Sequence, residues 1–106
     1  MPSHHASKLV AICRRALLGE YSVVEAARLI SPLAHDLDPD GGDSDLNLFR
    51  AIDSETDHLP VGHVRDRWEE EALARKDEEL AKVESFYGDT AADSYRALLD
   101  RYDETV

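Results

Sequence analysis

The sequence is poor in the features that most often reveal function. Its single cysteine, Cys13, excludes an internal disulfide, and we expect a cytoplasmic protein. No stretch approaches the roughly 18 consecutive apolar residues of a membrane span, so no membrane partner is predicted. The basic pair Arg14 and Arg15 lies inside the first apolar stretch instead of ahead of it, which is unlike a secretory signal.

The motifs that usually carry enzyme chemistry are also missing. The chain has no glycine-rich nucleotide loop, no nucleophile elbow and no paired-histidine zinc motif. A chain of 106 residues can form one modest core, which leaves little volume for a substrate cleft. We therefore predict a non-enzymatic protein that binds no cofactor.

Basic side chains are scarce, with 12 Lys and Arg against 23 Asp and Glu, for a net charge of -11. Residues 1–35 carry four bases and two acids, whereas the rest of the chain carries eight bases and 21 acids. Because nucleic-acid binding depends on neutralising phosphates, no nucleic-acid partner is predicted. An acidic surface instead speeds encounters with a basic protein partner, although solubility alone also explains such a charge.

Helical periodicity is what the sequence has in abundance. Apolar residues recur every three or four positions in a first helix over residues 9–17, which Gly19 is expected to end. The pair Ser22 and Glu25 has the spacing of a capping box and opens a second helix. Pro32 is expected either to kink this helix or to start another with Ser31 as its N-cap.

Asp43 or Ser44 is expected to cap a third helix, and a long helix is predicted over residues 63–87 with Trp68 as a core anchor. Gly88 is expected to stop the long helix, so that a short last helix follows. The fold class is therefore all-α, a compact bundle of four to five helices with one long helix in the C-terminal half. It is predicted to be a single domain over residues 1–106, of which 1–6 form a flexible leader.

Two acidic segments are candidate sites. In "HDLDPDGGDSD", Asp36, Asp38, Asp40 and Gly41 match the start of a helix–loop–helix calcium loop over residues 36–47, but its last ligand position falls on Asn47. The same residues suit a proline-glycine turn, which we favour.

The second segment combines Asp53, Glu55, Asp57 and His58. Glu55 and His58 stand three apart, a spacing that suits a divalent ion or acid–base chemistry. A small metal-dependent enzyme or accessory subunit using these two residues is therefore a further alternative, beside plain helix termination and partner contact.

The segment "LPVGHVRDRW" (residues 59–68) resembles the proline-glycine loop ahead of a tryptophan-bearing helix in some bacterial immunity proteins, which are small acidic bundles that inhibit nuclease toxins. The tyrosine pair that precedes the loop in those proteins is absent here, where the sequence is "SETDH". The resemblance spans only this segment, and it implies an inhibitor that engages a basic nuclease.

The hypothesis that follows is a small acidic intracellular protein-binding domain, including the case of an inhibitor of immunity type, that engages a basic partner. A homodimer through the long helix, burying Leu80, Val83 and Phe86, is the other association that the sequence leaves open. The predicted partner-binding residues are the carboxylates of the two acidic segments: Asp36, Asp38, Asp40, Asp43, Asp45, Asp53, Glu55 and Asp57.

Overall fold

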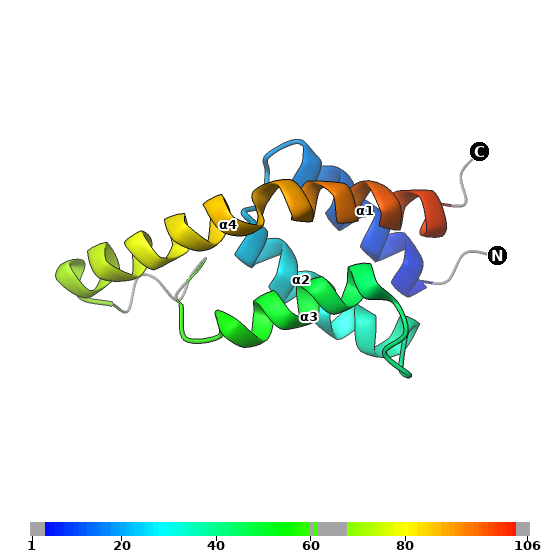
Figure 1. Cartoon of the computed structure of the whole chain (residues 1–106), viewed down its shortest axis with the longest axis horizontal. Helices are drawn as coiled ribbons and strands as arrows, with labels where there is room; N and C mark the ends of the chain where they lie inside the picture. The colour runs from blue at the N-terminus through cyan, green and yellow to red at the C-terminus, as the bar shows by residue number, and fades with distance from the viewer. Residues whose placement is uncertain (1–3, 60, 62–67, 104–106) are drawn as a thin grey trace.

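Four helices make up the fold in a computed structural model that describes residues 4–59, 61 and 68–103 (Figure 1). They are α1 (His4–Leu17), α2 (Val23–Leu37), α3 (Ser44–Glu55) and α4 (Glu70–Tyr102), and these described residues include no strand. Helices α2 and α4 each contact the other three helices, and α2 packs most extensively on α3. The predicted all-α class is confirmed. None of these helices is long and apolar enough to cross a membrane.

The predicted local signals at the helix ends are present. Gly19 has a φ of 81° just after α1, a left-handed conformation that glycine adopts without a Cβ clash. Ser22 accepts a hydrogen bond from the Glu25 backbone N–H at 3.1 Å, and the Glu25 side chain accepts from the Ser22 N–H at 3.2 Å. The Asp43 side chain caps α3 by accepting from the Asp45 and Leu46 N–H groups.

The course of α2 through Pro32 and the start of α1 refine two of the expectations. Helix α2 continues through Pro32 without a restart at Ser31, because buried Ile30, Leu33 and Ala34 hold both sides of the proline in the core. The flexible leader was predicted too long, since α1 begins at His4 and Ala6 is buried.

The predicted stop at Gly88 is wrong. Helix α4 runs for 33 residues through that position, so the predicted short last helix is part of α4. The physical reason is an uninterrupted apolar side: Tyr87 and Ala91, one turn apart across the glycine, both pack on the core. The predicted start at residue 63 lies outside the described residues, and α4 begins at Glu70.

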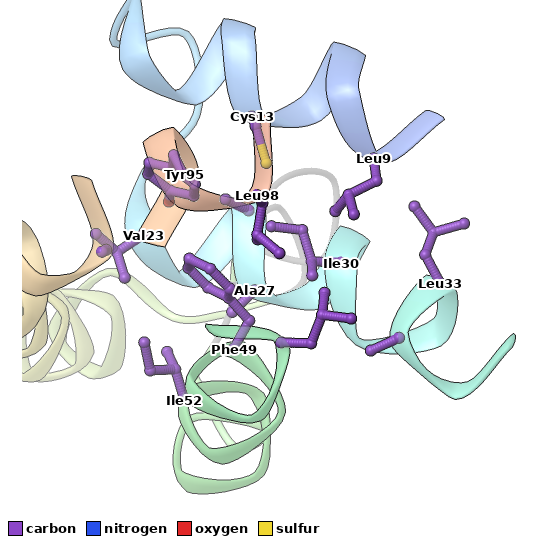
Figure 2. Packing of buried hydrophobic residues seen from close by; sticks show 14 residues of the cluster. Leu9, Cys13, Val23, Ala27, Ile30, Leu33, Phe49, Ile52, Tyr95 and Leu98 are labelled. Carbon is purple, nitrogen blue, oxygen red and sulfur yellow. The ribbon is translucent and has the colours of Figure 1, made fainter. Parts of the chain in front are cut away.

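The core is a cluster to which all four helices contribute (Figure 2). Phe49 of α3 is fully buried and stacks on Tyr95 of α4, with ring centroids 5.0 Å apart. The Tyr95 hydroxyl is buried without a hydrogen-bond partner in the described part of the chain. Cys13 is buried, and burial raises the pKa of its thiol to about 12, which disfavours the nucleophilic thiolate.

The first half of α4 lies outside this core. The core residues that α4 contributes begin at Val83, so residues 70–82 stand ahead of the cluster. Figure 1 shows this half extending beyond α1 and α2. On its exposed side Phe86 keeps 77% of its surface accessible. Trp68, predicted as a core anchor, is half-buried just before α4 and is not a member of the buried cluster.

Candidate protein-interaction surface

The loop between α2 and α3 is built around Asp38. Its carboxylate accepts hydrogen bonds from the backbone N–H groups of Gly42 at 3.1 Å and Asp43 at 2.9 Å, and Arg50 lies 3.3 Å away. These bonds, above all the one from Asp43, hold the pKa of Asp38 below its ordinary value against a smaller opposing effect of burial. The Gly41 N–H closes a turn onto the Asp38 carbonyl at 3.1 Å, with a φ of 73° at Gly41, as the turn interpretation predicted.

Asp43 and Asp45 face the last turn of α4. Arg101 donates to the Asp43 carboxylate at 2.7 Å and pairs with Asp45 at 2.9 Å, and Ser94 donates to Asp45 at 2.8 Å. Asp43, Asp45 and Arg101 line an open hollow of about 440 Å³ whose walls are mostly polar. Asp43 therefore caps α3 and holds the end of α4 at the same time, which is a structural role for a residue predicted to bind a partner.

The three carboxylates of the calcium pattern have separate surroundings. Asp36 pairs with His5 at 3.1 Å, Asp38 is held by the turn, and Asp40 is exposed. Over the residues that the structure describes, no three His, Cys, Asp or Glu side chains are arranged to hold a metal ion.

The second acidic segment is tied to α4 by two contacts. Glu55 accepts a hydrogen bond from the Tyr87 hydroxyl at 2.7 Å, which raises the pKa of Tyr87, and His58 contacts Glu79 at 2.8 Å, which lowers the pKa of Glu79. Glu55 and His58 thus have different partners on α4 and hold it against the end of α3. The side chains of Asp53 and Asp57 make no hydrogen bond or ion pair with another described residue.

Three arginines that the sequence did not point to hold these segments in place. Arg50 donates to the Ala34 and Asp38 carbonyls, both at 2.6 Å, and Arg101 binds Asp43 and Asp45. Arg28 of α2 donates to the Thr56 and Leu59 carbonyls after α3. Arg101 and Asp43 are 58 positions apart, so no local pattern could have paired them.

The shifted pKa of Asp38 makes a prediction about acid stability. Because the folded-state pKa is lowered, the stabilisation by this carboxylate is complete above its ordinary value of 3.8 and is lost as the pH falls through the folded-state value. Asp38→Asn is expected to melt at a lower temperature than the parent at neutral pH, and the gap should narrow as the pH falls below 3.8. Thermal melting followed by circular dichroism across pH measures this, and Asp40→Asn is the matched control. A gap that stays constant with pH would show that the charge of Asp38 is irrelevant.

The carboxylates that remain exposed, without a partner among the described residues, gather on α4. Besides the predicted Asp40 and Asp57, the set consists of Glu69, Glu70, Glu71, Glu78, Asp89 and Asp100. Fewer basic side chains are exposed without a partner among the described residues: Lys8, Arg75 and Lys82. Among the residues that the structure describes, the exposed acidic surplus therefore lies mainly along α4, and it is densest at the start of that helix.

No protein-family model, curated protein or solved structure matches this chain. Residues 60 and 62–67, which carry most of the proline-glycine segment similar to that of immunity proteins, lie outside the described residues.

Proposed function

We propose that this chain is a small acidic protein-binding domain that works by engaging a basic protein and not by catalysis. The observation that supports it is the exposed acidic surplus that remains after internal pairing. A surface potential of one sign attracts a partner of the opposite sign and speeds its association. Such a function needs charged side chains held in fixed relative positions, and the four-helix bundle is a scaffold that can hold them.

The interaction surface that fits this function best is the exposed side of α4. Asp38, Asp43 and Asp45 already bind arginines of their own chain or backbone N–H groups, so a partner would have to displace those contacts. Glu71 and Glu78 are seven residues apart, about two helical turns, and so lie on the same side of α4. Both are exposed and have no partner among the described residues. Binding to a lysine or arginine of another protein would therefore break no described contact within the chain.

An inhibitor of a nucleic-acid-binding protein is the narrower form of this proposal. Carboxylates placed along a helix can occupy a basic surface that otherwise binds phosphates. An adjacent reading frame that encodes a large toxin-like protein would favour this form over a general binding domain.

Reversing charge on α4 tests the surface. Glu71→Lys/Glu78→Lys is expected to weaken binding to the basic partner about tenfold, because two attractive contacts become repulsive. The partner would be captured from an extract of the source organism on the immobilised chain, identified by mass spectrometry, purified and titrated by calorimetry at low and high salt.

The matched control is Asp40→Lys/Asp57→Lys, which changes the net charge equally on the two segments that the sequence predicted. Equal losses in both variants would mean that affinity follows net charge and not the α4 surface. If only the control lost affinity, the interface would lie on the sequence-predicted segments. A captured partner that is acidic, or binding that is indifferent to salt, would contradict the proposal itself.

A further inference from the structure

The projecting half of α4 carries a row of side chains whose charges are complementary to those of the same row on a second, antiparallel copy of the helix. Arg75, Glu79, Lys82 and Phe86 are spaced by four, three and four residues, the spacing of a helix–helix seam. Arg75 and Lys82 are exposed, Glu79 is half-buried and Phe86 is 77% accessible. Val83, in contrast, packs on the core of its own chain, so a contact made by Leu80, Val83 and Phe86 together does not describe this face.

We propose that this row is the contact through which two copies of the chain pair, with their α4 helices antiparallel. In that arrangement Glu79 of one copy faces Lys82 of the other, and Lys82 faces Glu79, which makes two ion pairs. At the two ends of the seam Phe86 of one copy faces Arg75 of the other, a cation–π arrangement. Any parallel pairing in register would instead place like charges opposite one another.

The shape of the molecule allows this pairing. Because residues 70–82 stand ahead of the core, the antiparallel overlap places the two bundles at opposite ends of the helix pair (Figure 1). Glu79 already contacts His58 at 2.8 Å and Lys76 at 3.5 Å, yet a carboxylate offers about four acceptor positions and can also accept from a lysine of the second copy. This inference is independent of the proposed function.

Charge swapping tests the seam, with dimerisation followed by analytical ultracentrifugation over a wide range of protein concentration at physiological ionic strength. Glu79→Lys and Lys82→Glu are each expected to weaken the dimer about tenfold, because both ion pairs become like-charge contacts. The double variant Glu79→Lys/Lys82→Glu restores complementarity between copies and should return the parent affinity. Phe86→Ala is expected to weaken the dimer as well.

The control is Glu70→Lys, which makes the same charge change on the opposite side of α4 and should leave the dimer unchanged. Circular dichroism checks the folding of each variant, and Lys82→Glu carries the test alone if Glu79→Lys fails to fold, since Lys82 has no described partner in its own chain. A parent chain that is monomeric at every concentration, or a double variant no better than the single ones, would overturn the proposal.

Discussion

Replacing Phe49 with alanine is expected to lower the free energy of unfolding by about 3–5 kcal/mol. Its ring is fully buried and stacks on Tyr95 between α3 and α4 (Figure 2). The truncation removes apolar contact area from the centre of the cluster and leaves a cavity that rigid neighbours on α2 and α4 cannot close. Since domains of this size are stable by about 5–15 kcal/mol, the variant should be only marginally stable. Urea denaturation followed by circular dichroism measures the loss.

Phe86→Ala is the matched control for this prediction, because it makes the same substitution on a ring that is 77% accessible. Its effect on the free energy of unfolding should stay within about 0.5 kcal/mol when measured at protein concentrations low enough to keep the chain monomeric. Comparable losses in the two variants would mean that Phe49 is not the centre of the core.

The parts of the fold that the sequence revealed are those whose chemistry is local. Ser22 and Glu25 are three residues apart and satisfy each other's backbone N–H groups, so the pair is recognisable without knowledge of the rest of the chain. Gly19 ends α1 through its own backbone conformation. Asp43 caps α3 through N–H groups two and three residues ahead of it. Each signal involves partners within one helical turn, where spacing alone fixes the geometry.

The pairing of the acidic loop's carboxylates with arginines could not be predicted, because those arginines are distant in the sequence. Arg101 pairs with Asp43 and Asp45 although it lies up to 58 positions away. Asp38 is held mainly by the nearby backbone N–H groups of Asp43 and Gly42, and Arg50 contacts it from 12 positions away. From the sequence these carboxylates looked available to a basic protein, whereas folding gives several of them arginines of the same chain. The charge pattern indicates the sign of the surface, but only the fold shows which carboxylates stay exposed. For this reason we propose the exposed side of α4, and not the loop, as the partner-binding surface.

Gly88→Pro is expected to destabilise the chain by about 3 kcal/mol or more, because Gly88 lies inside α4 and not at its end. Proline at that position removes the backbone N–H that bonds to the carbonyl one turn earlier and forces its ring against that carbonyl. The break would fall between Val83 and Tyr95, both of which pack on the core, so the two halves of the helix could not stay in register. Chemical denaturation measures the loss, and a helix that ended at residue 88 would tolerate the change.

Alanine at the same position is expected to act in the opposite direction. A Cβ added at Gly88 meets nothing within 4 Å, and the backbone there is helical, so Gly88→Ala should stabilise the chain by about 0.5–1 kcal/mol through helix propensity. Gly19→Ala is the matched control: its Cβ is equally free of contacts, but the φ of 81° is unfavourable for alanine, so the free energy of unfolding should fall by about 1 kcal/mol. Had Gly88 ended a helix as Gly19 does, both substitutions would destabilise. Opposite signs at two unobstructed glycines would therefore show that α4 is continuous, because only the backbone conformation distinguishes them.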